Sequence, residues 1–233
     1  MPSRRRVPVQ AEHSYPPEPW PLRGQAHVSL WRVPAGRLPA AVQRAVPRGA
    51  TPFRFGGSFL LATAWVSYQR GSVLEYEELM CTVLVRRGGR LFPTISHIWV
   101  DSAASRDGGR ALWAIPKELA SFEVLPGARL RAREAGPGEA VLAEAGIDVL
   151  ATLPLRVPFA LGVLQSRSST PQLSRVRGTA RPALSRARWS VEHAGPLGFL
   201  SGLRPLGTVS MRDFRMWFGA LDTPNTSERF AGP

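Results

Sequence analysis

Short runs of β-branched and aromatic residues, each bounded by turn residues, constrain the fold of this chain more than any other feature. The runs at 58–69, 79–87 and 91–101 are of this kind, and Gly88-Gly89 between the last two predicts a tight hairpin. Further strands are expected at 26–33, 121–125, 128–134, 139–144, 147–155, 158–166, 183–193 and 207–217. We expect helical structure only in short segments, at 38–45 and directly after Pro116.

Many short strands joined by tight turns favour a mainly β (α+β) domain. Its strongly curved antiparallel sheet is expected to close into a barrel or cone. The length of 233 residues suits one domain of this kind. Residues 1–19 are rich in proline and lack a periodic apolar pattern, so we interpret them as a flexible leader. The sequence therefore predicts one domain over 20–219, followed by a flexible tail over 220–233.

The excess of basic residues does not by itself indicate a nucleic-acid partner. Lys and Arg together number 30 against 17 Asp and Glu, which gives a formal net charge of +13. Apart from Arg4–Arg6 the arginines are scattered, and no zinc-finger spacing or RNA-binding aromatic signature occurs. We therefore expect solvated surface charge and no nucleic-acid partner.

Membrane, secreted and metal-binding classes are also disfavoured. The most apolar run, 59–66, is far shorter than the ~18–20 residues of a membrane span. The N-terminal arginines are not followed by the apolar stretch of a secretory signal. The single cysteine, Cys81, excludes an internal disulfide and a Cys-rich metal site. We expect a cytoplasmic protein that uses no metal or cofactor.

The basic residues include one lysine, Lys117, and it lies in the densest motif of the chain. Residues 100–122 contain, in order, Asp101, Gly109-Arg110, Pro116-Lys117 and Leu119-Ala120. Together with Tyr76-Glu77-Glu78 and the segment 195–214, this stretch resembles the acetoacetate decarboxylase family. The resemblance covers roughly residues 20–218 with long unmatched spacers.

The resemblance implies covalent catalysis by an amine, and it assigns that amine to Lys117. A neutral lysine amine would add to the carbonyl of a small oxo acid or a related compound and lose water. The resulting iminium accepts the electrons of the bond that breaks, so decarboxylation and aldol or dehydration steps of the lyase type need no further cofactor. The resemblance places the active-site glutamate of the family at Glu78, which would move protons as general acid and base.

A nucleophilic lysine must be unprotonated near neutral pH, whereas a free lysine has a pKa of about 10.4. Burial in an apolar pocket would lower that pKa. The residues that we expect around the substrate are Trp99, Trp113 and Ile115 as apolar walls, with Arg23 as a candidate contact for a carboxylate. Arg110 is expected to anchor its loop through hydrogen bonds, with contact to a substrate carboxylate as the alternative.

The chain departs from the family pattern in three places. Glu118 follows Lys117 where acetoacetate decarboxylase has a second lysine, and residues 61–63 hold no acid where the family has another glutamate. Gln25 stands close to the position of the carboxylate-binding arginine of the family. These departures indicate a divergent member. An alternative is a catalytically inactive small-molecule binding module on the same fold, and in either case the chain could form a homo-oligomer.

Overall fold

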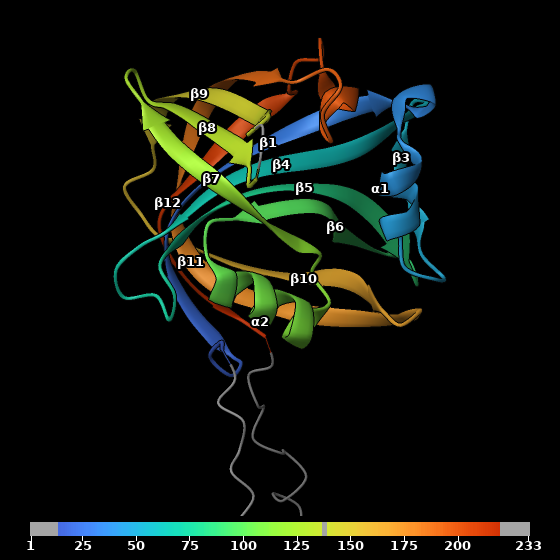
Figure 1. The fold of residues 1–233 in the computed structure, drawn as a ribbon, viewed down its shortest axis with the longest axis horizontal. Coiled ribbons are helices and arrows are strands. Elements are labelled where there is room, and N and C mark those ends of the chain that lie inside the picture. The colour runs from blue at the N-terminus through green and yellow to red at the C-terminus, as the bar shows by residue number, and fades with distance from the viewer. Residues whose placement is uncertain (1–13, 137–138, 220–233) are drawn as a thin grey trace, which may run out of the picture.

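A computed structural model describes residues 14–136 and 139–219 of the chain. Strands dominate it, as expected for a mainly β domain (Figure 1). The strands are β1 (Trp20–Pro34), β2 (Thr51–Pro52), β3 (Arg54–Phe55), β4 (Ser58–Tyr68), β5 (Tyr76–Arg87), β6 (Arg90–Val100), β7 (Lys117–Leu125), β8 (Arg129–Glu134), β9 (Val141–Thr152), β10 (Val157–Arg167), β11 (Thr170–Val191) and β12 (Gly207–Phe218). The helices are α1 (Ala40–Ala45) and α2 (Ala103–Trp113), with 3-10 turns at Ala35–Arg37 and Gly198–Leu200. None of these helices is long and apolar enough to cross a membrane.

The strands form one curved sheet in which hydrogen-bonded neighbours follow the order β2-β5-β6-β7-β8-β9-β11-β12-β1-β4-β3. Because β4 also pairs with β5, the order of neighbours returns on itself. Neighbours are antiparallel except β6 and β7, which run parallel where residues 98–100 meet 117–119. The prediction of a strongly curved sheet is therefore confirmed, with one parallel pair in an otherwise antiparallel arrangement.

Several strand boundaries differ from those expected. The runs at 139–144 and 147–155 belong to one strand, β9, and β11 continues through the basic segment 170–182 that was not expected to be a strand. The predicted hairpin between β5 and β6 is present. Gly88 and Gly89 have φ of 55° and 76°, the left-handed values that a two-residue turn of this type needs.

The prediction of a helix after Pro116 is wrong, because the helix comes before this proline and a strand follows it. Parallel strands need a crossover connection, and α2 provides one between β6 and β7. The Ser102 side chain caps α2 by accepting a hydrogen bond from the Ser105 N–H, and Ala114 ends it with φ of 55°. Two consecutive glycines, 108 and 109, obscure this helix in the sequence, since each is ~1 kcal/mol less favourable than alanine there.

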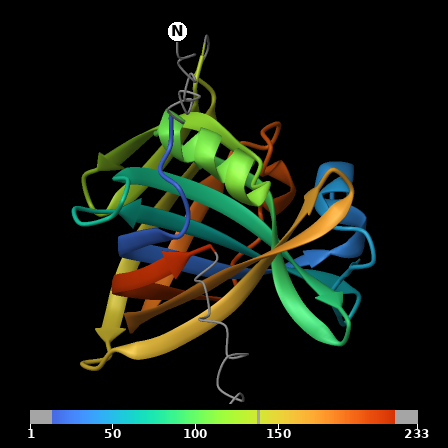
Figure 2. The same cartoon turned by 90° about the horizontal axis from the view of Figure 1, so that it is seen from below.

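Alternate residues of β4 and β5 face two separate hydrophobic clusters. Leu61 and Leu79 face the first cluster, which also receives side chains from β7, β8 and β9. Ala64 and Val66 face the second, to which β10, β11 and the end of α2 contribute. Figure 2 shows the hairpin of β10 and β11 as a long arm that crosses the end of the sheet. The second cluster contains the candidate site.

Hydrogen bonds from one side chain attach this arm to β6. Gln165 of β10 donates from Nε2 to the Ile95 carbonyl at 3.2 Å, and its Oε1 accepts from the Ile95 N–H at 2.8 Å. Thr94 donates from Oγ1 to the Leu164 carbonyl at 2.9 Å. A buried amide thus replaces a backbone ladder where β10 meets β6, and it satisfies both polar groups of Ile95.

Residues 14–19, which the sequence assigned to the leader, contact the domain. The Pro16 carbonyl accepts a hydrogen bond from Trp20 Nε1 at 2.9 Å, and Glu18 Oε2 accepts one from Trp113 Nε1 at 2.7 Å. These residues therefore contact the start of β1 and the end of α2. The rest of the expected leader, 1–13, and the expected tail, 220–233, lie outside the described residues.

Candidate active site

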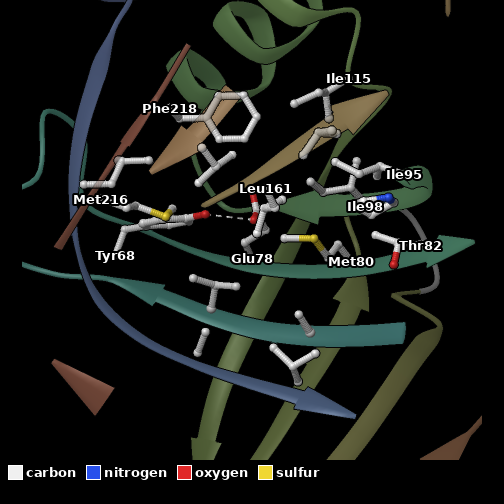
Figure 3. A pocket seen from close by; sticks show the side chains of 18 of the residues that line it. Tyr68, Glu78, Met80, Thr82, Ile95, Ile98, Ile115, Leu161, Met216 and Phe218 are labelled. Atoms are coloured by element: carbon white, nitrogen blue, oxygen red, sulfur yellow. Dashed lines mark hydrogen bonds between the residues drawn. The ribbon is translucent and has the colours of Figure 1, made fainter. Parts of the chain in front are cut away.

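A cavity of about 270 Å³ occupies the second hydrophobic cluster (Figure 3). Strands β1, β4, β5, β6, β10, β11 and β12 contribute to its lining, together with the end of α2 and Lys117 at the start of β7. The lining is almost entirely apolar, and its side chains with polar groups other than the two indoles are Tyr68, Tyr76, Glu78, Thr82 and Lys117. Four of these five gather at one end of the cavity, where they form a hydrogen-bonded group.

Lys117 is buried, with 3% of its surface exposed, and three acceptors surround its amine. Nζ donates to Glu78 Oε2 at 2.8 Å, to Ser105 Oγ at 2.9 Å and to Tyr76 Oη at 3.3 Å. An ammonium has three N–H donors, so this set of acceptors matches the protonated form of the side chain. Nζ also lies 4.8 Å from the centre of the Tyr76 ring, a cation–π distance.

A second phenol holds the other oxygen of the carboxylate. Tyr68 Oη donates to Glu78 Oε1 at 3.1 Å, the interaction drawn as a dashed line in Figure 3. Tyr68 and Tyr76 face each other across β4 and β5, with ring centres 4.3 Å apart. Burial raises the pKa of both phenols, so both stay neutral at physiological pH. Glu78 is thus held from both sides, by an ammonium and by a phenol.

The pKa of Lys117 is raised above its ordinary value. Burial by itself lowers this pKa, but the attraction of the Glu78 carboxylate, with a smaller contribution from Tyr76, outweighs burial. Burial alone therefore does not set the pKa of Lys117, because Lys117 and Glu78 form a buried ion pair. The sequence could not give this result, because the distance between the two side chains depends on how β5, β6 and β7 pair.

Helix α2 approaches the Lys117 side chain closely through a glycine. A Cβ at Gly109 would lie 2.8 Å from Lys117 Cδ and 2.9 Å from Cε, closer than side chains tolerate. A Cβ at Gly108 would likewise lie 2.5 Å from an atom of the Trp20 ring. Ser105 stands one turn before Gly109 on the same helix face, so this close approach brings its hydroxyl to the amine.

Glu118, which stands where the family has a second lysine, points away from the amine of Lys117. Adjacent side chains of a strand face opposite sides, and the Glu118 side chain is 63% exposed. Its Oε1 accepts a hydrogen bond from Arg110 Nη2 at 2.5 Å. Arg110 is thus engaged in a hydrogen bond on the outer side of α2, and because it does not line the cavity, the alternative of a contact with a substrate carboxylate is not supported.

Trp99 also lies outside the cavity. A β-bulge in β6 changes which residues after it face the cavity, so Trp99 lies on the opposite face of the strand from Ile95. Cys81 pairs with His97 but Thr82 pairs with Ile95, so Ser96 is an extra residue on β6. Residues before and after the bulge, at 95 and 98, therefore face the cavity, while Trp99 joins the first hydrophobic cluster. Simple alternation along the strand had placed Trp99 on the pocket wall.

Of the other residues expected around the substrate, two line the cavity and one does not. Trp113 and Ile115 line the cavity beside Lys117. Arg23 does not, because it is exposed on the outer face of β1, where its side chain lies against Gly71. The structure thus brings together Lys117, Glu78, Trp113 and Ile115, and it leaves Arg23, Trp99 and Arg110 elsewhere.

Three residues of the polar group were not identified as functional from the sequence. Tyr76 was noted only as part of a motif, and Tyr68 lies near the end of an expected strand with no signal that paired it with Tyr76. Ser105 carried no comparable signal, because its role depends on a helix that the sequence did not indicate.

The fold and the site together define a mainly β protein with an amine–carboxylate pair inside an apolar cavity. A family model described as "Acetoacetate decarboxylase (ADC)" matches residues 6–155 of the chain. The chain belongs to the acetoacetate decarboxylase family. No curated protein sequence matches it.

Solved structures with the same fold include enzymes. "Enduracididine biosynthesis enzyme MppR complexed with pyruvate" is 18% identical, with a TM-score of 0.62 and 88% of this chain and 90% of that chain covered. An acetoacetate decarboxylase from Legionella pneumophila is 16% identical, with a TM-score of 0.63 and coverage of 96% and 92%. An acetoacetate decarboxylase-like enzyme from Sphingomonas wittichii RW1 is 14% identical, with a TM-score of 0.58 and coverage of 89% and 92%. At these identities the likeness concerns the fold.

Proposed function

We propose that this protein is a cofactor-independent lyase that forms a Schiff base between Lys117 and a carbonyl compound. The observation that carries the proposal is the Lys117–Glu78 pair, with 2.8 Å between Nζ and Oε2, at the polar end of an otherwise apolar cavity. The Schiff-base lysine and a proton-transferring carboxylate are the two groups that such chemistry needs. Membership of the acetoacetate decarboxylase family supports the same assignment.

Glu78 would first accept a proton from the Lys117 ammonium, which leaves a neutral amine and a carboxylic acid. Entry of an apolar ligand favours this transfer, because a neutral pair costs less than an ion pair once water leaves the cavity. The amine then attacks the carbonyl carbon and gives a carbinolamine. Glu78 returns its proton to the departing hydroxyl, and water leaves as the iminium forms.

The iminium withdraws electrons from a bond to the neighbouring carbon. Loss of CO₂, of a proton or of an aldol fragment at that carbon gives an enamine, and protonation of the enamine followed by hydrolysis frees Lys117. Tyr68 would orient Glu78 throughout through its hydrogen bond to Oε1. Ser105 and Tyr76 would position Nζ through the two bonds that do not involve the carboxylate.

The second candidate is a catalytically inactive binding module, and one observation favours it. The raised pKa of Lys117 means that the resting amine is protonated, and an ammonium is not a nucleophile. In a binding module the ion pair would serve as a fixed hydrogen-bonding group for a carbonyl oxygen.

Reductive trapping separates the two candidates. The protein is incubated with 2-oxo acids, 3-oxo acids and simple ketones in the presence of cyanoborohydride, and peptide mapping then locates any added mass. A stable adduct at Lys117, absent from Lys117→Met/Glu78→Gln, is the expected result. If no compound modifies Lys117 while the same compounds raise the Tm of the wild-type protein, the binding module is correct.

A further inference from the structure

We infer that the ligand of this cavity is a carbonyl compound with an uncharged, apolar tail of medium length, bound with its carbonyl group innermost. The inference rests on the proposed function for the identity of the reacting group. Among the carbonyl compounds that could react with Lys117, the ligands expected here are medium-chain alkyl or aryl-alkyl ketones and aldehydes.

The cavity is elongated along the strands, with its polar group at one end. Glu78, Met80 and Thr82 line it from successive inward positions of β5. At about 3.3 Å per residue, Thr82 lies ~13 Å along the strand from Glu78. Ala62, which pairs with Thr82, marks the same far end on β4, so a bound molecule has room to extend well beyond the reacting carbonyl.

Exposure of the lining residues shows which end faces solvent. Tyr68, Glu78 and Lys117 are 6%, 2% and 3% exposed, whereas Leu161 on β10 is 43% exposed. Thr82 is half-buried. Leu161 precedes residues 164 and 165, which hydrogen-bond to residues 94 and 95 of β6, whereas Lys117 pairs with Ile98 further along that strand. A ligand must therefore pass between apolar walls to bring its reacting end to Lys117, and its other end stays near the mouth.

The charges in the cavity disfavour a second ionised group on the ligand. Among the described residues that line it, the ionised side chains are Lys117 and Glu78, and no arginine occurs. A substrate carboxylate would have to share Lys117 with Glu78 in an apolar environment, where an unpaired charge is expensive. Arg23 and Arg110, the two cations considered as contacts for a carboxylate, both lie outside.

The size of the cavity sets the length of the tail. An apolar cavity of about 150 Å³ in another protein holds one benzene ring, so the 270 Å³ here suits a ligand of roughly eight to twelve non-hydrogen atoms. Three alanines, at 26, 62 and 64, line the sheet side and leave this space open. Ala64 lies four residues from Tyr68 and two from Ala62 along β4, so a larger residue there would shorten the cavity without touching the ion pair.

A homologous series of methyl ketones tests the inference. Acetone, butanone, hexanone, octanone, decanone and tetradecanone are each measured twice, by reversible stabilisation of the protein in thermal unfolding and by cyanoborohydride trapping at Lys117. The ketone concentration that gives half-saturation should fall by about fourfold per added methylene, equivalent to ~0.8 kcal/mol of binding free energy. This trend should stop when the tail fills the cavity at about ten carbons. A keto acid of decanone length with a terminal carboxylate should bind at least tenfold more weakly, and pyruvate and acetoacetate should bind more weakly still.

Two matched variants locate the tail. Ala64→Leu should abolish the advantage of octanone and decanone while acetone still binds. Ala160→Leu adds the same side chain at an exposed position of β10 beside Leu161. It should change neither the binding of the long ketones nor that of acetone. Circular dichroism and Tm confirm that both variants are folded.

The two readouts separate the failure of this inference from failure of the proposed function. Thermal stabilisation that grows with chain length, without any adduct at Lys117, would refute the Schiff base and leave the ligand class standing. Adducts with pyruvate or acetoacetate at lower concentrations than with decanone would overturn the ligand class and keep the Schiff base. Stabilisation that is independent of chain length would also overturn the ligand class.

Discussion

Glu78→Gln keeps the shape of the side chain and removes its charge, so it tests whether the ion pair keeps Lys117 protonated. The two charged atoms are 2.8 Å apart. With an effective dielectric constant of ~20, unit charges at that distance attract by about 6 kcal/mol. Removal of one partner from a buried pair typically costs ~3–5 kcal/mol, and ~1.36 kcal/mol changes a protonation equilibrium tenfold. The ratio of ammonium to amine at Lys117 should therefore fall by at least about 100-fold.

The direction of the pH dependence follows from the same balance. In the wild-type protein the pKa of Lys117 is raised, so trapping should become faster as the pH rises into the alkaline range. Without the carboxylate, burial is the dominant effect and it lowers the pKa of the amine. The rising limb of adduct formation should therefore move to lower pH in Glu78→Gln, although turnover is lost with the proton-transferring group.

Nitrogen NMR of the lysine side chain measures this directly. Lys117 is the only lysine in the chain, so lysine labelled at Nζ gives one side-chain resonance to follow with pH. Glu118→Gln is the matched control, because it removes a neighbouring charge that is exposed and faces away. The reasoning fails if Glu78→Gln titrates at the wild-type pH, or if Glu118→Gln shifts the titration as far.

Three further outcomes concern packing. Gly109→Ala should cost ~1–3 kcal/mol in urea unfolding and reduce trapping, whereas Gly36→Ala, with no atom within 4 Å of the added Cβ, should do neither. Gln165→Leu leaves a buried N–H and carbonyl of β6 without partners and should lower the free energy of unfolding by ~2–4 kcal/mol. Gln69→Leu, at an exposed position, should change it by no more than ~0.5 kcal/mol, and equal losses in the two variants would contradict the bridging role of Gln165. Burial raises the pKa of the Cys81 thiol to about 12, so thiol reagents should react only as fast as the protein unfolds, and rapid labelling of the native state would refute this.

The strands could be predicted from the sequence because their information is local. β-branched runs and the Gly88-Gly89 turn specify β5, β6 and the hairpin between them without reference to the rest of the chain. α2 could not be predicted, because its glycines disfavour a helix and its formation depends on packing against Trp20 and Lys117. Tertiary contacts, rather than propensity, therefore decide the segment on which Lys117 depends.

The sequence identified two residues of the site, but not the arrangement of the side chains around them. Lys117 and Glu78 were marked by motifs, whereas their separation depends on one parallel and one antiparallel strand pairing. The position of Trp99 depends on a single extra residue at 96, and period-two reasoning cannot detect a β-bulge. A cytoplasmic location and association with copies of itself stay predictions from the sequence.

The two faces of β4 and β5 have a consequence for how this protein can evolve. On β5, Leu79 and Cys81 belong to the first cluster, whereas Met80 and Thr82 beside them line the cavity. Substitutions at the cavity positions can therefore change which molecule is accepted while the first cluster is left intact. A library restricted to even-numbered positions of 62–66 and 80–82 should retain folded members at high frequency, and the same diversity at the odd-numbered positions should not.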